Sequence, residues 1–169
     1  MRVLITGGAG FIGSHVTDAL LKRGDEVICL DNFNDYYDPK RKRRNVAPFV
    51  DLTGYRLCEG DIRSEDDLQV VFGTEKIDKV LHVAAMAGVR SSIKNPALYS
   101  AVNVTGTSNV LEMTRRHEVS SFVFASSSSV YGARGQAPFR EDEAVDHPIS
   151  PYAATKRAAE LLTYTYHHL

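Results

Sequence analysis

The stretch RVLITGGAGFIG, residues 2–13, decides how this chain folds. Residues 2–6 form a short apolar run that ends in glycines, and residues 11–23 then place apolar side chains at helical spacing up to Gly24. A strand, a glycine-rich turn and a helix in this order are the context that a phosphate-binding loop for a dinucleotide requires. The sequence therefore predicts such a loop at residues 6–13.

The three glycines of this loop, spaced GxxGxxG, have separate roles. Gly7 permits the tight turn, Gly10 lets the backbone approach a pyrophosphate, and Gly13 lets the helix pack against the strand. The amides of Phe11 and Ile12 would meet the phosphates at the helix N-terminus, where the helix dipole favours negative charge.

The rest of the chain alternates between strands and helices. Strands are expected at 26–30, 55–59, 79–84 and 121–126, and helices at 39–45, 64–73, 92–117 with a break near Pro96, and from Pro151 onward. A parallel crossover needs a helix-length connection, so this alternation predicts an α/β fold with a doubly wound parallel sheet, a Rossmann fold. No linker or repeat divides residues 1–169, which predicts one dinucleotide-binding domain.

Composition excludes several classes of protein. The 169 residues are 43% hydrophobic and 24% charged, and 20 Lys and Arg against 21 Asp and Glu leave a net charge of −1. No overall field draws such a chain to nucleic acid or to an anionic membrane. No apolar stretch is long enough to span a bilayer, and Met1 stands directly before a core strand, which leaves no room for a signal peptide. A cytoplasmic location is expected.

The cysteines and histidines predict no metal site. Cys29 and Cys58 each lie inside an expected strand rather than in a CxxC pair, which favours small buried side chains. The six histidines are scattered, and His167 and His168 have no Cys or carboxylate at ligand spacing.

Acidic residues after the second and third strands predict where the adenosine binds. Asp31 can accept hydrogen bonds from both ribose hydroxyls and, with Asn32 beside it, favours NAD over NADP, because a 2′-phosphate would meet a like charge. Asp61 and Ile62 could cap the adenine edge. The basic run KRKRR, residues 40–44, is interpreted as a solvated helix face, with anion steering as the alternative. Ala84 and Ala85, after the fourth strand, could run under the nicotinamide ribose.

Two reactive side chains share one face of the last helix. Tyr152 and Lys156 are four residues apart, with Ser150 as the expected N-cap and Pro151 at the first helical position. An ammonium group beside a phenol favours the ionised phenolate that a base needs. The serines at 126–129 end the fifth strand, at the sheet edge where ligands bind.

These motifs resemble the extended short-chain dehydrogenase/reductase family, of the NAD-dependent epimerase/dehydratase type. The resemblance is carried by TGGAGFIG (6–13), Asp31, SSSSVYG (126–132) and PYAATK (151–156), and it covers essentially the whole chain. Within the family, DNFNDYYD (31–38) and AGVR (87–90) are similar to the UDP-glucuronate 4-epimerase group.

The resemblance implies a set of roles. Ser127, Tyr152 and Lys156 would be catalytic, with Tyr152 and Lys156 also touching the cofactor. Ser127 would hydrogen-bond the reacting sugar hydroxyl, with Ser128 beside it in the substrate site and Ser126 or Ser129 as alternative assistants. Arg90 would bind substrate, and Asn103 would help organise the cofactor site. The implied reaction is 4-epimerisation of a UDP-sugar, UDP-glucuronate/UDP-galacturonate or UDP-glucose/UDP-galactose, by transient oxidation of C4 with NAD.

Related 4,6-dehydratases place an acidic pair directly after this serine or threonine. Here those positions hold Ser128 and Ser129, so elimination of water lacks its general acid and base. Members of the family also continue into a C-terminal substrate domain, which is expected to be absent from these residues. The chain is therefore interpreted as the cofactor-binding half of an epimerase, whose turnover without the substrate domain is an open question. The alternative is a non-catalytic NAD-binding short form or fragment. Relatives imply a homodimer and a nucleotide-sugar substrate.

Overall fold

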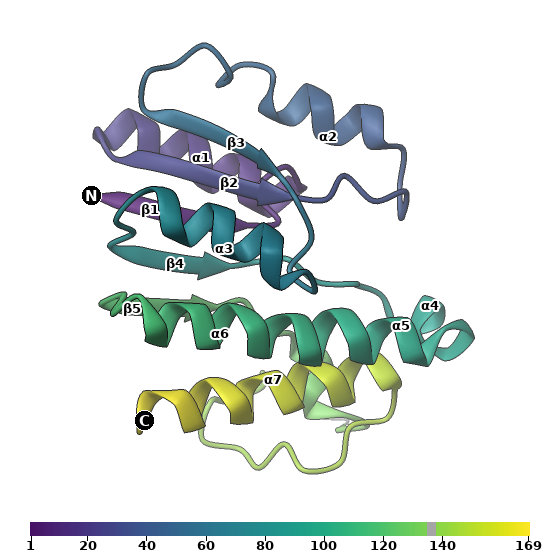
Figure 1. The fold of residues 1–169 in the computed structure, drawn as a ribbon. Helices are drawn as coiled ribbons and strands as arrows, with labels where there is room; N and C mark the ends of the chain where they lie inside the picture. Colours follow the sequence, from purple (N-terminus) through teal and green to yellow (C-terminus); the bar gives the residue numbers. More distant parts are fainter. Residues whose placement is uncertain (135–137) are drawn as a thin grey trace. The chain divides into compact units, whose positions relative to one another are not determined.

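The computed structural model describes residues 1–134 and 138–169. One parallel sheet holds the strands β1 (Arg2–Thr6), β2 (Glu26–Asp31), β3 (Tyr55–Glu59), β4 (Lys79–His82) and β5 (Ser121–Phe124), in the order β3-β2-β1-β4-β5 (Figure 1). The chain runs outward from β1 to β3 and then returns to the other side of β1 through β4. The predicted doubly wound parallel sheet is therefore confirmed.

The sheet is covered by helices on both faces. Figure 1 shows α1 (Phe11–Arg23) on one face and α3 (Glu65–Thr74) and α6 (Thr107–Arg116) on the other, and α2 (Pro39–Val46) connects β2 to β3. Because both faces are covered, the strands read as apolar runs rather than alternating ones. The side chains of Leu4, Ile5, Ile28 and Leu30 are at most 2% exposed, and each such burial contributes about 1.5–3 kcal/mol.

The chain divides into two compact units. We call Met1–Ala84 with Asn109–Ala125 the sheet unit, and Ala85–Ser108 with Ser126–Leu169 the helical unit. The chain passes between the units after Ala84, Ser108 and Ala125. Because each unit combines separate chain segments, no single linker marks the boundary in the sequence.

The helical unit is built around its last helix. It contains α4 (Val89–Lys94), α5 (Pro96–Ser100), the π-helix η1 (Ala101–Gly106), the 3₁₀ turn η2 (Ser128–Tyr131) and α7 (Pro151–His167). The helix α7 contacts all four of the other elements.

The helix expected over 92–117 is divided in the structure. It begins earlier, at Val89, and breaks at Asn95, because Pro96 cannot continue the hydrogen-bond ladder and Asn95 caps the next turn through its side chain. A π-helix then precedes α6. The strands β4 and β5 end two residues earlier than expected, so residues 83–84 and 125–126 are not part of the strands.

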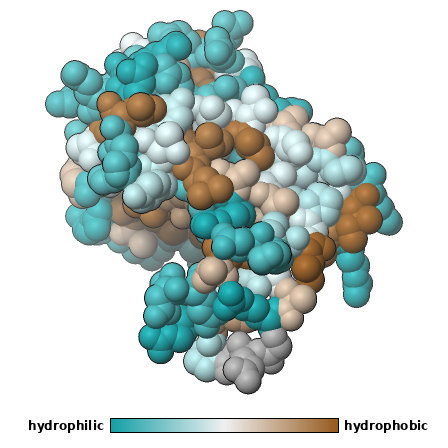
Figure 2. Space-filling view, turned by 90° about the horizontal axis from the view of Figure 1, so that it is seen from below, coloured by the Kyte–Doolittle hydropathy of each residue, from teal (hydrophilic) through white to brown (hydrophobic). Residues whose placement is uncertain are grey.

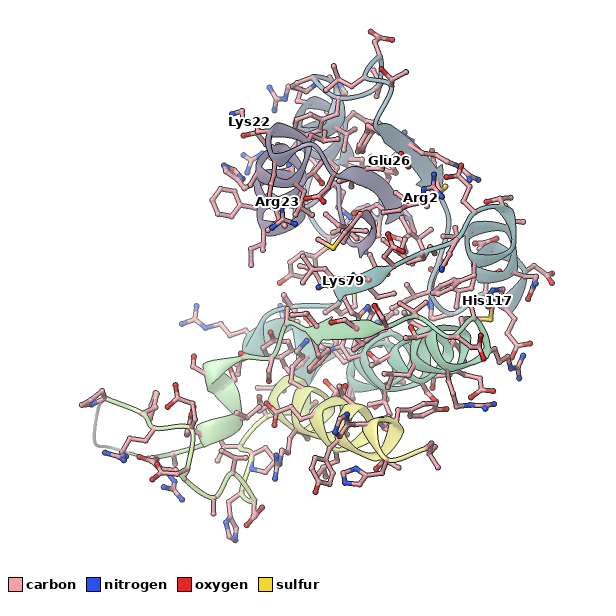
Figure 3. The ribbon with its side chains drawn as sticks, turned by 90° about the vertical axis from the view of Figure 1, so that its left-hand side faces the viewer. Arg2, Lys22, Arg23, Glu26, Lys79 and His117 are labelled. Carbon is pink, nitrogen blue, oxygen red and sulfur yellow. The ribbon has the colours of Figure 1, made fainter. Side chains whose placement is uncertain are left out.

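Charged residues mark the end of the sheet at which the strands begin. Arg2, at the start of β1, lies beside Glu26 at the start of β2, with a guanidinium nitrogen 2.6 Å from the carboxylate (Figure 3). A second carboxylate, that of Glu75, lies 2.9 Å from Arg2. Such partly exposed pairs contribute at most about 1 kcal/mol each. None of the helices in the described segments combines the length and the apolar character that crossing a membrane demands.

Candidate active site

The glycine turn after β1 has the geometry that the motif predicts. Gly7 has φ of +71°, and a β-carbon there would lie 2.7 Å from the backbone nitrogen of Ala84. A β-carbon at Gly13 would lie 2.6 Å from the Cα of Gly8. Neither distance is compatible with a side chain, so the turn conformation and the close approach of α1 both require glycine.

The helix α1 begins without a side-chain cap. Its N-cap is Gly10, which offers no acceptor, whereas Ser64 caps α3 and Ser150 caps α7 through their hydroxyls. The first turn also has no acidic residue, and Phe11 and Ile12 are 74% and 57% exposed. A helix start without its own acceptor leaves first-turn amides for a bound anion. The turn therefore fits the pyrophosphate of a dinucleotide.

Asp31 is buried and held by the protein itself. It is 6% exposed at the end of β2. Its carboxylate accepts hydrogen bonds from the Ala9 amide at 3.2 Å, the Phe33 amide at 2.9 Å and the Lys42 ammonium at 3.1 Å. Asp31 therefore joins the glycine turn, the loop after β2 and α2, and its contact with a ribose remains a prediction.

Lys42 is a site residue that sequence reasoning missed. Within the basic run, Lys40, Arg41, Arg43 and Arg44 are exposed as expected, but Lys42 is only 6% exposed. Its ammonium also donates to Asn34 Oδ1 at 3.1 Å. The available signal was its spacing: Lys42 stands four residues before the buried Val46, on the same helix face.

The residues after β3 form a polar cluster. Asn32 Nδ2 donates to Asp61 Oδ2 at 2.9 Å, and the Arg63 guanidinium donates to both oxygens of Asp61, at 2.9 and 2.7 Å. The Arg63 guanidinium lowers the pKa of Asp61 to about 2, with smaller help from Asn32, so the carboxylate is a permanent acceptor. Ile62 is 5% exposed, and its carbonyl accepts from the Asn109 amide at 3.2 Å.

The segment after β4 divides between the two units. Ala84 belongs to the sheet unit, where its amide donates to the Thr6 hydroxyl at 3.3 Å. Ala85 opens the helical unit and is partly exposed.

Tyr152 and Lys156 stand one turn apart at the start of α7. The Ser150 hydroxyl caps this helix by accepting from the Ala153 amide at 3.1 Å, and Pro151 fills the first position, as expected. Tyr152 is partly exposed, and its ring meets the edge of the buried Tyr99 ring at a centroid distance of 6.2 Å.

Lys156 is 3% exposed, and its surroundings act on its charge in opposite directions. Burial lowers the pKa of the ammonium to about 8, and the Glu160 carboxylate partly opposes this shift. The lysine is therefore a cation that can lose its proton near physiological pH.

The serines of residues 126–129 differ in role. Ser127 is the N-cap of η2, and its Oγ accepts from the Ser129 amide at 3.2 Å. Ser126 donates instead to the Glu160 carboxylate, and Ser128 is exposed. Ser127, Tyr152 and Lys156 thus belong to the same unit, in which η2 contacts α7.

Asn103 connects three segments of the helical unit from inside the π-helix. It is 2% exposed. Its Oδ1 accepts from the Met86 amide at 2.8 Å, and its Nδ2 donates to the Met86 carbonyl at 3.0 Å and to Thr155 Oγ1 at 3.1 Å. These bonds fit the expected organising role. A direct contact with a cofactor remains a prediction.

Arg90 lies exposed at the start of α4, and its guanidinium makes no hydrogen bond or ion pair with residues 1–134 or 138–169. The described residues contain no group of three or more His, Cys, Asp or Glu that could hold a metal ion. Both cysteines are free thiols, with Cys29 buried and Cys58 partly buried.

A glycine turn at the switch point of a doubly wound sheet, together with a serine and a YxxxK helix, defines the class of short-chain dehydrogenase/reductase enzymes. Residues 4–169 match the family described as GDP-mannose 4,6 dehydratase, and the chain belongs to this family. The predicted resemblance to the epimerase/dehydratase type is confirmed.

The chain is similar to curated UDP-glucuronate 4-epimerases. It is 46% identical to UDP-glucuronate 4-epimerase 4 of Arabidopsis thaliana, over 100% of this chain and 39% of the relative. It is also 46% identical to UDP-glucuronate 4-epimerase of Thermodesulfobacterium geofontis, over 98% of this chain and 51% of the relative. The chain therefore spans about half the length, or less, of these relatives.

A solved structure supports the same similarity. UDP-glucuronic acid 4-epimerase from Bacillus cereus, in complex with UDP-glucuronic acid and NAD, matches with 35% identity and a TM-score of 0.91 over 99% of this chain and 52% of that one.

Proposed function

We propose that this chain carries the cofactor-binding and catalytic residues of an NAD-dependent 4-epimerase that acts on a UDP-sugar. The observation that carries the proposal is the pair of Tyr152 and buried Lys156, one turn apart on α7 in the same unit as Ser127. The uncapped glycine turn at α1 supports NAD as the cofactor. Bound NAD would supply reversible two-electron oxidation of a secondary alcohol.

In this proposal the side chains of the helical unit transfer the proton of the sugar 4-hydroxyl. The Tyr152 phenolate would take the proton of the sugar 4-hydroxyl and later return it, because the Lys156 ammonium stabilises the negative phenolate oxygen. The Ser127 hydroxyl would hydrogen-bond the same sugar oxygen and fix its orientation. Arg90, whose guanidinium makes no hydrogen bond or ion pair with a described residue, would bind an anionic group of the nucleotide sugar.

The substrate would be UDP-glucuronate/UDP-galacturonate or UDP-glucose/UDP-galactose. The similarity to UDP-glucuronate 4-epimerases favours the first pair. A 4,6-dehydration is disfavoured, although the family is described by such an enzyme, because Ser128 and Ser129 supply no carboxylate for elimination.

Calorimetric titration of the chain with NAD, followed by addition of UDP-glucuronate and a product assay for the 4-epimer, tests the proposal. NAD binding with epimer formation is the expected result. NAD binding without sugar binding or turnover would instead support the second candidate, a cofactor-binding chain that lacks catalysis. Absence of NAD binding would contradict both.

The variant Tyr152→Phe separates catalysis from cofactor binding. We expect this variant to lose epimer formation, because it has no proton acceptor, while its Kd for NAD stays within about threefold of the wild-type value. The control is Tyr164→Phe, at a 68% exposed position on the same helix, which should leave both quantities unchanged. Parallel loss of NAD binding and turnover in Tyr152→Phe would contradict the assigned role.

A further inference from the structure

Glu160 is the one acidic residue of α7, and it lies one turn after Lys156. Residues 152, 156 and 160 follow one another at intervals of four, so Glu160 is the next residue along the helix face that carries Tyr152 and Lys156. Its side chain is only 24% exposed, and a partly buried charge acts more strongly on its neighbours than a fully hydrated one. The carboxylate is therefore placed to influence both residues of the YxxxK pair.

The Glu160 carboxylate also binds the segment that carries Ser127. We call residues 126–129 the serine segment. Ser126 Oγ donates a hydrogen bond to Glu160 Oε1, and the Oγ of the next residue, Ser127, accepts from the Ser129 amide at 3.2 Å. A hydrogen bond to an ionised acceptor is about twice as strong as one between neutral groups. Glu160 therefore fixes the place at which the serine segment meets α7.

An arginine of the same helix holds the second oxygen of this carboxylate. Arg157 Nη1 donates to Glu160 Oε2 at 3.0 Å, and Arg157 Nη2 lies 3.8 Å from Asp146 Oδ1. Because each oxygen of Glu160 has its own donor, the carboxylate is held in one orientation, with Oε1 facing Ser126.

The charge of Glu160 acts on Lys156. Burial lowers the pKa of Lys156 to about 8, and the Glu160 carboxylate partly opposes this shift. Tyr152 and Arg157 are the nearest titratable residues on α7 itself. The four elements that contact α7, which are α4, α5, η1 and η2, contribute the titratable side chains of Arg90, Lys94, Tyr99 and Tyr131. None of these four elements contains an acidic residue, so the negative charge that favours the ammonium form comes from α7.

We propose that Glu160 is a positioning residue of the epimerase reaction, which fixes the serine segment to the helix that carries Tyr152 and Lys156. The inference rests on the proposed function, because it assumes that Ser127 and Tyr152 bind the same sugar oxygen. Glu160 is assigned no contact with the sugar or with NAD. It acts through Ser126, which sets the place of Ser127, and through its charge, which favours the Lys156 ammonium.

Amide exchange and lysine titration, both measured by NMR, test the two effects separately. In E160A and in S126A, the exchange rate of the Ser129 amide should rise about tenfold, because the serine segment loses its bond to α7. In E160Q, the lysine ε-methylene signal that is absent from Lys156→Met should titrate at a lower pH than in the wild type, because the negative charge is removed. S126A keeps the carboxylate and should leave this titration unchanged.

The matched control is D146N, which removes the other carboxylate near Arg157, at a side chain that is 65% exposed. This variant keeps the bond between Ser126 and Glu160, so the exchange of the Ser129 amide and the titration of Lys156 should match those of the wild type. Unchanged exchange in E160A, or an unchanged titration in E160Q, would overturn the inference. Changes of the same size in D146N would also overturn it.

The epimer assay connects these measurements to the reaction. The kcat of E160Q should decline at a lower pH than the kcat of the wild type, with KM unchanged, because its Lys156 loses the proton earlier. A pH profile of kcat identical to that of the wild type would overturn the inference and leave the proposed function intact. A wild type that binds NAD but forms no epimer would overturn the proposed function, whatever the exchange rates of the variants.

Discussion

Lys156 shows how burial and charge compete at a single residue. Its ammonium is 3% exposed on α7, yet the proposed reaction uses its positive charge to support the Tyr152 phenolate. Burial lowers its pKa from 10.5 to about 8, and the nearby Glu160 carboxylate limits the shift. A lysine with a depressed pKa destabilises the folded state wherever the ammonium remains protonated.

This competition predicts a pH dependence of stability. Between the folded pKa of about 8 and the ordinary value of 10.5, the unfolded chain holds a proton that the folded chain has released, so Lys156 destabilises the fold less as pH rises. In Lys156→Met this contribution is absent. The stability of the wild type relative to Lys156→Met should therefore increase by about 1–2 kcal/mol between about pH 7.5 and 9.5.

Urea unfolding of both proteins at the two pH values measures this change. The pKa values of Cys29 and Tyr55 are raised by burial, which destabilises the fold at high pH. This effect is the same in the wild type and the variant, so it cancels in the difference between their free energies of unfolding. The control Lys40→Met replaces an exposed lysine of α2 and should differ from the wild type by the same amount at both pH values. A pH-independent difference for Lys156→Met would contradict the lowered pKa.

Single residues were predictable where a local pattern fixes their position. Tyr152 and Lys156 follow from helical spacing behind a Ser-Pro start, and Gly7 and Gly13 follow from the turn between strand and helix. The Asp31–Lys42 pair was not predicted, because its members meet only when α2 folds back on the end of β2. Within the run KRKRR, the sequence composition does not distinguish the buried Lys42 from its exposed neighbours.

At the scale of elements, the π-helix Ala101–Gly106 was the feature hardest to predict. Its sequence, AVNVTG, has ordinary helical spacing, and the wider turn accompanies tertiary bonds made by Asn103. Those bonds join Met86 and Thr155. By contrast, the bounds of β1, α1 and β3 agree with the expected ranges, because apolar runs closed by glycine or polar residues define them locally.

Removal of the Asn103 side chain should destabilise the fold. Asn103→Ala would leave the amide and carbonyl of Met86 without their side-chain partners, and such losses cost about 1–3 kcal/mol per buried group. We expect about 3 kcal/mol of lost stability in urea unfolding. The control Asn109→Ala removes a partly exposed amide with bonds of 3.2 and 3.3 Å, and it should lose less than about 1 kcal/mol. Similar losses in the two variants would argue against an organising role for Asn103.

At the scale of the whole molecule, the sequence predicted the sheet but not the division of the chain into two compact units. Alternation of strands and helices predicted the sheet and its parallel direction. The division into units was not visible, because the chain passes between them after Ala84, Ser108 and Ala125 rather than through one linker. The glycine turn belongs to the sheet unit and the Tyr152 helix to the helical unit.

The helical unit also carries apolar side chains on its surface. On α7, Leu161 and Tyr164 are 53% and 68% exposed and lie three residues apart, and on α4 Ile93 is 65% exposed. Figure 2 shows apolar patches separated by polar residues on the face that it presents. Exposed large apolar side chains are found at sites of protein contact. The homodimer that the family resemblance implies stays a prediction, and the exposed face of α7 is the surface on which it can be tested.

Sedimentation velocity at about 50 µM tests the dimer. We expect the wild type to sediment as a dimer and the variant L161E/Y164E as a monomer, because two carboxylates would be buried without partners at the contact. The control V50E/L52E changes two residues of the sheet unit that are 49% and 47% exposed, and it should remain dimeric. A monomeric wild type would contradict the proposal. A dimeric L161E/Y164E would place the contact on another surface, since the charged pair would then remain in solvent.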